Sequence, residues 1–198
     1  MQLKPYSQAA ENNKNYILEQ LKVYLPDPVT VLEIGSGTGQ HAVYFSAQLP
    51  HLQWQTSDLE CNHSGIAQWI EESRANNVAH PINLNVQDGH WHEFKAEAVY
   101  SANTAHIMSW DRVQDMIKGI SAMLPRGGHW FQYGPFNVAG QYTSQSNADF
   151  DAWLKEDDAR RGIRDIEAMT EFAYQYRIKL LADMSMPANN RLLIFKRF

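Results

Sequence analysis

The sequence predicts an α/β fold in which a mostly parallel sheet of seven strands carries helices on both faces. Two observations lead to this fold class. Short apolar segments with strand character alternate with segments of helical spacing along most of the chain, and such alternation is typical of parallel sheets. A glycine-rich segment at residues 31–39 joins the first expected strand to the helix that follows it. The last two expected strands are joined by a short turn, which predicts an antiparallel hairpin at one edge of the sheet.

The predicted elements follow one another in a regular order. Residues 7–25 form the first expected helix, because Ile17, Leu21 and Leu25 share one face and Pro26 ends it. Another well-marked helix begins after Ser109, a residue type that caps helices, and stops before Pro125. The remaining helices are expected at residues 40–49, 64–76 and 165–176. The seven strands are expected at residues 29–34, 52–56, 82–86, 98–102, 129–133, 178–184 and 191–196.

The length and composition predict one globular domain over residues 1–198. The chain has 198 residues, of which 44% are hydrophobic, and this is enough for a full core. Within the domain, residues 1–28 form an N-terminal helical segment. Residues 134–164 are rich in Gly, Ser, Gln, Asn and Asp and predict a lid insertion, with one short helix near residues 150–156.

The charge and the N-terminal sequence bear on location and partners. The net charge of −5 disfavours a nucleic-acid partner, which needs clustered Lys and Arg. The first residues contain no apolar stretch, so neither a signal peptide nor a membrane anchor is expected. Cys61 is the only cysteine, which fits a reducing compartment. We therefore expect a cytoplasmic protein without a membrane partner, and the sequence does not indicate its oligomeric state.

The segment VLEIGSGTG carries the clearest chemical signal. Gly35, Gly37 and Gly39 alternate after the first strand, and Glu33 precedes them. A dinucleotide-binding loop would place its third glycine at position 40, where this chain has Gln40. The observed pattern, E-x-G-x-G-x-G, resembles motif I of the S-adenosylmethionine-dependent methyltransferases with a Rossmann-like fold.

A more specific resemblance extends from about Ala9 to Lys196. The segments ENNK, VLEIGSGTGQHAVYF, LPHLQWQTSD, SANTAHIMSW, YGPF, SQSNADFDAWL, GIRD and MPANN occur in the order found in the family of domain of unknown function 938, whose animal members are called methyltransferase-like protein 26. The resemblance implies a class I methyltransferase fold and S-adenosylmethionine as cofactor, and it implies no acceptor. The chain departs from the family pattern at Asn12, where arginine is expected, and at Asn85, where aspartate is expected.

The demands of this cofactor assign roles to residues at the strand ends. Glu33 is expected to hold the ammonium group of the methionine tail through water, and Asp58 to receive the ribose hydroxyls, with Glu60 as the fallback. Asp58 has an alternative role as a loop acid or helix cap. The glycine loop should admit the tail, the end of the third strand should meet the adenine, and the end of the fourth should lie beneath the sulfonium. The further cofactor-binding candidates are Gly35, Ser36, Gly37, Gly39, Asn85, Val86, Ser101, Ala102 and Asn103.

Acceptor-side candidates follow the fourth and fifth strands. His106 is the candidate general base, since an unperturbed imidazole takes up a proton near neutrality; the alternative is a histidine packed under the lid as a hydrogen-bond donor. Tyr133 and Asn137 could orient the acceptor. In the lid, four polar residues are expected to line the acceptor pocket and three apolar ones to anchor it: Tyr142, Ser146, Asn147 and Asp149, then Phe150, Trp153 and Leu154.

These observations favour a methyltransferase that acts on a small molecule rather than on a protein. Two alternatives remain open: a non-catalytic module that binds S-adenosylmethionine for a partner protein, and a nicotinamide oxidoreductase, which Gln40 disfavours. No metal is expected, because His90 and His92 have no third ligand at a defined spacing. Cys61 would need an activating neighbour to act as a nucleophile, and the proximity of His63 in the sequence does not establish one.

Overall fold

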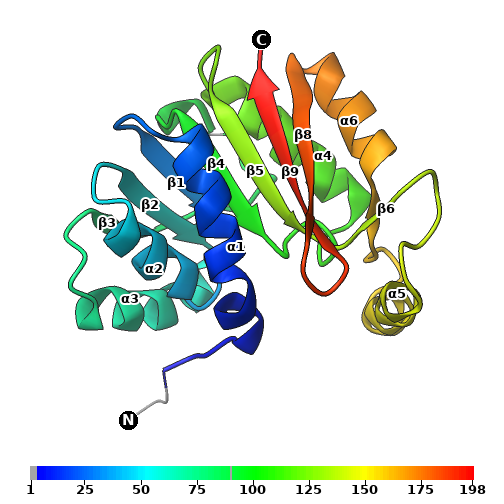
Figure 1. Ribbon diagram of the computed structural model, residues 1–198, viewed down its shortest axis with the longest axis horizontal. Coiled ribbons are helices and arrows are strands. Elements are labelled where there is room, and N and C mark those ends of the chain that lie inside the picture. Colours follow the sequence, from blue (N-terminus) through cyan, green and yellow to red (C-terminus); the bar gives the residue numbers. More distant parts are fainter. Residues whose placement is uncertain (1–3, 90) are drawn as a thin grey trace. The chain divides into compact units, whose positions relative to one another are not determined.

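The computed structural model describes residues 4–89 and 91–198 and contains a seven-stranded sheet with the strand order β3-β2-β1-β4-β5-β9-β8 (Figure 1). The predicted fold class, a mostly parallel sheet with an antiparallel C-terminal hairpin, is confirmed. The chain divides into two compact units. Unit 1 holds the chain up to Asn85 together with Ala96–Ser101, and unit 2 holds Val86–Lys95 and Ala102–Phe198. The assignment of residues 1–198 to a single domain stays a prediction.

Unit 1 is built on parallel strands. Strand β1 pairs in parallel with β2 and with β4, and β2 pairs in parallel with β3. The rings of Phe45, Trp54 and Tyr100 form the aromatic centre of its core, with centroids 5.4 to 5.7 Å apart. The elements in chain order are α1 (Gln8–Tyr24), β1 (Thr30–Ile34), α2 (Gln40–Gln48), β2 (Gln53–Asp58), the 3₁₀ turn η1 (Glu60–Asn62), α3 (His63–Glu72), β3 (Val78–Asn83) and β4 (Ala98–Ala102).

The third strand lies earlier in the chain than predicted. It spans Val78–Asn83 rather than residues 82–86. Its pairing with β2 shifts by one residue between Gln55 and Ser57, and Pro81 falls inside this irregularity. A bulge in an edge strand tolerates a proline because the missing N–H is not needed for pairing. Asn85 therefore lies two residues beyond the strand rather than within it.

Unit 2 contains the antiparallel hairpin. Strand β9 pairs antiparallel with both β5 and β8, and the last two strands run side by side at the orange and red end of the chain (Figure 1). Trp130 and Phe195 stack across the β5–β9 pair with centroids 4.4 Å apart. The elements are η2 (Trp91–Glu93), α4 (Trp110–Met123), β5 (His129–Gly134), β6 (Phe136–Asn137), α5 (Gln145–Asp157), β7 (Arg164–Asp165), α6 (Ile166–Gln175), β8 (Ile178–Met186) and β9 (Asn190–Arg197).

The segment at residues 134–164 is more regular than predicted. Helix α5 has 13 residues and starts earlier than predicted. Ser144 caps its N-terminus, since the Ser144 hydroxyl accepts a hydrogen bond from the Asn147 N–H at 3.1 Å. The buried Asp151 carboxylate connects this helix to its surroundings: it accepts from the Ile163 N–H at 2.6 Å and from the Tyr142 hydroxyl at 2.7 Å. The segment is thus held by a buried charge with several donors. Its role as a lid stays a prediction.

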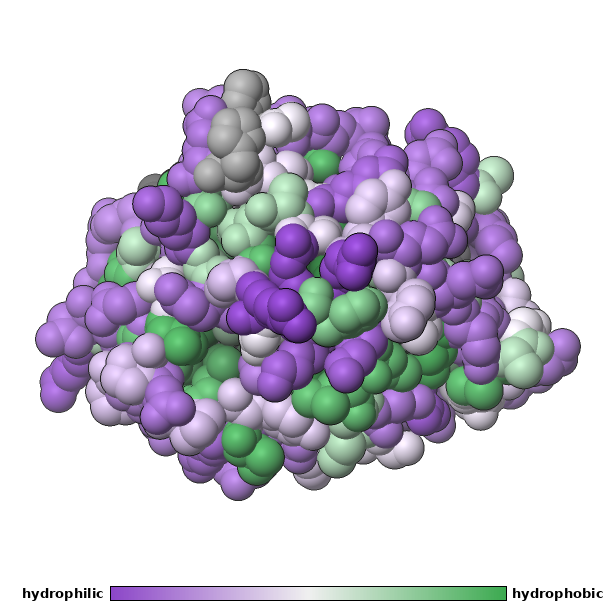
Figure 2. Space-filling view, turned by 90° about the horizontal axis from the view of Figure 1, so that it is seen from above, coloured by the Kyte–Doolittle hydropathy of each residue, from purple (hydrophilic) through white to green (hydrophobic). Residues whose placement is uncertain are grey.

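The surface is mixed in character. On the face shown in Figure 2, polar residues separate the apolar ones into patches. Among the helices that the structure describes, none combines the length and the apolar character needed to cross a bilayer.

Candidate functional site

The three glycines of the loop all have a left-handed backbone. Their φ angles are 71° at Gly35, 59° at Gly37 and 89° at Gly39, a region that side chains rarely adopt. A Cβ atom at Gly39 would lie 3.1 Å from the Ile66 Cα and 3.3 Å from the Trp69 Cβ, so this glycine lets α2 start against α3. A Cβ atom at Gly37 would meet nothing within 4 Å. The loop is therefore tightly packed at its third glycine and open at its second.

Asp58, the predicted ribose residue, lies directly beside this loop. Its Oδ2 accepts from the Gly37 N–H at 2.7 Å. Its Oδ1 accepts from the Leu59 N–H at 2.7 Å and from the Asn62 side-chain amide at 2.8 Å. Asp58 as a whole residue is 8% exposed. The structure thus brings Asp58 and the glycine loop together, and the carboxylate holds the Gly37 turn in place.

Glu33 is buried at the end of β1, where it is 2% exposed. The Trp54 indole N–H donates to its Oε2 at 3.0 Å. Burial raises the pKa of the Glu33 carboxyl to about 7, against the effect of this hydrogen bond, and the neighbouring Asp58 charge adds to the rise. Glu33 therefore changes charge near neutrality, where a bound cation would favour its ionised form.

Ser101, predicted to lie beneath the sulfonium, is fully buried in unit 1. Its hydroxyl donates to the Ile34 carbonyl at 2.9 Å. The side chain thus joins the end of β4 to the residue before the glycine loop. Its contact with a cofactor stays a prediction.

The two predicted adenine residues fall in different units. Asn85, in unit 1, follows Leu84, whose N–H donates to the Asp58 carbonyl at 3.1 Å. Val86 begins a segment of unit 2, and its carbonyl accepts from the Trp91 indole at 3.4 Å. Their role in adenine binding stays a prediction.

A small polar cavity borders the glycine loop on the side of α3. It has a volume of about 170 Å³, and its lining residues are Pro5, Gly37, Cys61, Asn62, Ser64, Gly65 and Gln68. The residues before α1 form one wall, since the Pro5 carbonyl accepts from the Trp69 indole at 2.7 Å and the Lys4 ammonium lies 3.7 Å from the centre of the Trp69 ring. The chain segment that precedes α1 therefore forms part of the surroundings of the loop.

Gln40 has a role that sequence reasoning missed. Its side-chain oxygen accepts from the Ser7 N–H at 2.5 Å, and its amide donates to the Glu11 carboxylate at 2.8 Å, so it connects the start of α2 to the start of α1. Glu11 in turn pairs with Lys14. From the sequence, Gln40 only disfavours a dinucleotide-binding loop. No spacing rule links position 40 to Ser7 and Glu11, because the contact depends on how α2 packs against α1.

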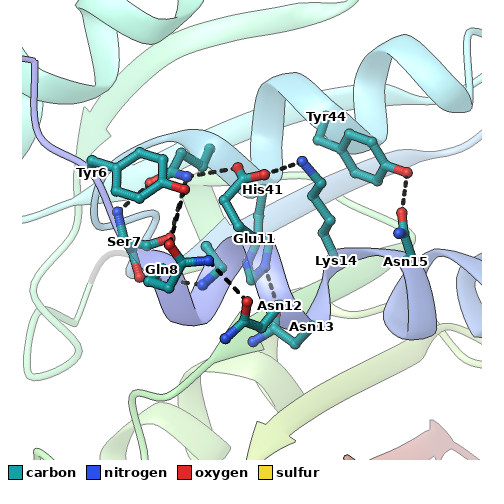
Figure 3. Close-up of polar contacts among 12 residues, drawn as sticks. Tyr6, Ser7, Gln8, Glu11, Asn12, Asn13, Lys14, Asn15, His41 and Tyr44 are labelled. Carbon is teal, nitrogen blue, oxygen red and sulfur yellow. Dashed lines mark hydrogen bonds and ion pairs between the residues drawn. The ribbon is translucent and has the colours of Figure 1, made fainter.

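His41, the next residue, is a second buried group that the sequence analysis missed. Its Nε2 lies 2.7 Å from the Asn13 Oδ1, which can only accept, so Nε2 carries the proton (Figure 3). Its Nδ1 then accepts from the Tyr100 hydroxyl at 3.1 Å. Burial lowers the pKa of the imidazole to about 4, so the ring is neutral at physiological pH. Both ring nitrogens are satisfied, which makes His41 part of the scaffold.

His106, the predicted base, lies in unit 2 among different surroundings. It is 5% exposed, and its imidazole has no hydrogen-bond partner in the part of the chain that the structure describes. A Cβ atom placed at Gly134 would lie 3.7 Å from both the His106 Nδ1 and the Asn103 Oδ1, so these two polar atoms converge beside that glycine. The Asn103 backbone has a φ of 58° and donates to the Tyr133 carbonyl at 2.9 Å.

Arg164 holds the loop that carries His106. Its guanidinium donates to the Ala105 carbonyl at 3.0 Å and to the Met108 carbonyl. The Gly162 N–H also donates to the His106 carbonyl at 3.0 Å. Burial lowers the pKa of the His106 imidazole to about 4, and the Arg164 charge acts in the same direction. The ring is therefore neutral at physiological pH and able to accept a proton or a hydrogen bond.

Two other acceptor-side candidates, Tyr133 and Asn137, also lie in unit 2. The Tyr133 backbone carbonyl accepts from the Asn103 N–H. Asn137 lies in β6, and its buried side-chain oxygen has no partner among the described residues.

The polar residues predicted to line the acceptor pocket mostly serve the structure of the segment. The Asn147 amide donates to the Asn189 carbonyl at 3.2 Å, and the Asn189 amide donates to the Ser146 hydroxyl at 3.2 Å. The Asp149 carboxylate accepts from Gln145 at 2.9 Å. The two Asn189 contacts join α5 to the turn between β8 and β9, and the Asp149 contact lies within α5. The assignment of these residues to an acceptor pocket stays a prediction.

The structure offers no metal site among the residues that it describes, where no three His, Cys, Asp or Glu side chains gather. Of the two histidines considered as a metal pair, His90 and the side chain of His92 lie outside the described part.

Several solved structures with the same fold are methyltransferases. An O-methyltransferase family protein from Burkholderia thailandensis superposes with a TM-score of 0.81 at 16% identity, over 92% of this chain and 54% of its own. An O-methyltransferase family 2 protein from Planctomyces limnophilus, in complex with apigenin, gives 0.83 at 12% identity, over 96% and 58%. Human N-acetylserotonin methyltransferase, in complex with S-adenosylmethionine, gives 0.80 at 11% identity, over 96% and 53%.

At such identities the likeness shows the fold alone, and the chain spans little more than half the length of these proteins. The prediction of a Rossmann-like methyltransferase fold is therefore confirmed. The predicted family is tested by a different comparison. A family model described as "Protein of unknown function (DUF938)" matches residues 4–197, nearly the whole chain, and the chain belongs to that family.

Proposed function

We propose that this protein is an S-adenosylmethionine-dependent methyltransferase with a small-molecule acceptor. The observation that carries the proposal is the pairing of the Gly37 N–H with the Asp58 carboxylate at 2.7 Å, in a loop whose second glycine is open to a ligand. A carboxylate beside a glycine turn suits a ligand with a ribose diol and without a pyrophosphate. The likeness of the fold to that of solved methyltransferases supports the same assignment.

His106 is the residue that we assign to the acceptor. S-adenosylmethionine, when bound, supplies an electrophilic methyl group on a sulfonium. The neutral imidazole of His106 can accept the proton that a hydroxyl loses as its oxygen takes the methyl group. Arg164 and Gly162 fix the backbone around His106 through the carbonyls of residues 105, 106 and 108, so the ring is positioned before the acceptor arrives.

The two alternatives make different predictions. A nicotinamide oxidoreductase would bind NAD, yet the side chain of Gln40 occupies the position of the third dinucleotide glycine and contacts α1. A non-catalytic module would bind S-adenosylmethionine without turnover. Calorimetric titration with S-adenosylmethionine, S-adenosylhomocysteine and NAD separates the first alternative, and binding of NAD alone would contradict the proposal.

A pair of glycine variants tests whether the loop binds the cofactor. Gly37 and Gly140 both have positive φ angles, 59° and 71°, and a Cβ atom at either position would meet nothing within 4 Å. Alanine at either site should cost a similar 1–2 kcal/mol of stability, roughly the cost of a left-handed residue. Only Gly37→Ala should also weaken S-adenosylmethionine binding, by tenfold or more. Equal affinities of the two variants would exclude the loop from the binding site.

Turnover requires an acceptor, which a cell extract can supply. The protein is incubated with S-adenosylmethionine labelled on its methyl group and with extract separated into small molecules and proteins. We expect label in the small-molecule fraction. Cofactor binding without transfer to either fraction would favour the non-catalytic module.

A further inference from the structure

Three rings in unit 2 lead from the buried His106 to the surface. The His106 imidazole lies 5.2 Å from the Phe150 ring, edge to face at 73°. The Phe150 ring lies 5.8 Å from the Trp153 ring, and their planes differ by only 16°. His106 is 5% exposed, whereas Trp153 is 62% exposed. The three rings thus form a continuous aromatic series from the buried His106 to the exposed Trp153.

The helix that presents these rings is held firmly. Phe150 and Trp153 are three residues apart on α5, so they share a face. Asp151, on the same helix, is 2% exposed and accepts from the Ile163 N–H and the Tyr142 hydroxyl. These two nearly parallel rings on a well-anchored helix offer an aromatic surface for stacking, which favours a flat aromatic ligand over a saturated one.

Polar groups at the inner end of the series define the other part of the ligand. The His106 Nδ1 and the Asn103 Oδ1 both lie 3.7 Å from the Cβ position of Gly134, and neither side chain has a hydrogen-bond partner in the described ranges. Both atoms can accept a hydrogen bond when the imidazole is protonated on its other nitrogen. The positive charge of Arg164 lies close to His106 and favours a ligand that becomes an anion there.

We propose that the acceptor is a planar aromatic compound with an acidic ring hydroxyl, which stacks on Phe150 and Trp153 and directs the hydroxyl to His106. This inference rests on the proposed function. In the reaction, the hydroxyl proton passes to the His106 imidazole and the oxygen forms the new bond to the methyl carbon. The bond between that carbon and sulfur breaks, and its electron pair stays on the neutral thioether.

The proton balance adds support for an acidic hydroxyl, beside the charge of the neighbouring Arg164. Burial holds the pKa of His106 at about 4, whereas an ordinary phenol such as a tyrosine side chain has a pKa of about 10. Proton transfer between them has an equilibrium constant on the order of 10⁻⁶. An alcohol is a still weaker acid than a phenol. Electron-withdrawing groups on the ring lower the barrier, so acidic phenols should be preferred.

The experiment compares a flat acidic phenol with a saturated ring. Wild-type protein with bound S-adenosylhomocysteine is titrated with 4-nitrophenol and with cyclohexanol in a calorimeter. The same titrations use Trp153→Ala and a matched control, Tyr174→Ala. Tyr174 is 61% exposed and its ring lies 5.3 Å from that of Phe198, so its exposure and ring contact resemble those of Trp153.

We expect 4-nitrophenol to bind at least tenfold more tightly than cyclohexanol. Trp153→Ala should weaken the binding of 4-nitrophenol by about 2- to 12-fold, which corresponds to the loss of one aromatic–aromatic interaction. Tyr174→Ala should leave the affinity for 4-nitrophenol unchanged. Equal affinities for the two rings, or equal effects of the two variants, would overturn the inference. A labelled protein, amine or aliphatic product from the extract experiment would also overturn it, whereas failure to bind S-adenosylhomocysteine contradicts the proposed function itself.

Discussion

Replacing Glu33 by glutamine should remove a pH-dependent cost to the stability of the fold. The carboxyl is 2% exposed, and burial raises its pKa from 4.5 to about 7. Below pH 4.5 it is protonated in the folded and the unfolded chain and has no effect. Between pH 4.5 and 7 the unfolded chain releases the proton while the folded chain keeps it, so the free energy of unfolding falls as the pH rises.

The size of this effect follows from the pKa shift. One pKa unit corresponds to about 1.4 kcal/mol, so between pH 5 and pH 8 the wild type should lose about 2 to 3 kcal/mol of stability through Glu33. Glutamine has the same shape, and its side-chain oxygen can still accept from the Trp54 indole. The Glu33→Gln variant should therefore lack this part of the decline.

Urea unfolding at pH 5 and pH 8 measures the difference for wild type, Glu33→Gln and a control, Glu71→Gln, which changes an exposed carboxyl of unit 1. The quantity compared is the change in unfolding free energy between the two pH values. The control should follow the wild type, and Glu33→Gln should be less pH-dependent by about 2 to 3 kcal/mol. Parallel behaviour of all three proteins would mean that Glu33 is ionised in the folded state at pH 5, and the reasoning from burial would be wrong.

Three further predictions concern unit 2. A Cβ atom at Gly119 would lie 2.1 Å from the Trp91 ring, so Gly119→Ala should lower the unfolding free energy by about 1–3 kcal/mol. This loss should outweigh the intrinsic helix preference of alanine over glycine, which is about 1 kcal/mol. If the contact with Trp91 is absent, urea titration would instead show a higher unfolding free energy for the variant. His106→Gln should lower turnover by roughly 10²- to 10⁴-fold while S-adenosylmethionine affinity stays unchanged. Because burial places the His106 pKa at about 4, the imidazole becomes protonated, and the wild-type rate should fall, only as the pH approaches 4. A rate that already declines with an apparent pKa near 6.5 would contradict this assignment.

Much of the fold follows from local sequence signals. The glycine loop, the strand β4 at Ala98–Ala102 and the helix that begins after Ser109 all lie where periodicity and turn residues predict them. The third strand was misplaced because Pro81 reads locally as a break. Only pairing with β2 reveals that a bulge accommodates it, and such pairing is a non-local property.

The sequence predicted individual residues of the candidate site, but not the side-chain contacts that join them. Asp58 was expected near the glycine loop, and its hydrogen bond to Gly37 agrees with that expectation. Spacing could not show that Asp151 is buried among three donors or that Asn147 reaches Asn189 across 42 positions of sequence, because both depend on tertiary packing. The second of these contacts joins the segments SQSNADFD and MPANN of this chain.

The hydrogen bonds of Asp58 have a consequence for how a ribose would be distinguished from other sugars. A carboxylate offers about four lone-pair positions, and among the described residues three donors already occupy both positions on Oδ1 and one on Oδ2. Two of these donors are backbone groups, so only the Asn62 amide can rotate away. One hydroxyl of a diol would donate to the vacant position on Oδ2, and the other would replace the Asn62 amide as a donor to Oδ1. The Asp58 carboxylate would then accept only one more hydrogen bond than before. Removing one hydroxyl should then be penalised little, and selectivity for the sugar would have to come from shape.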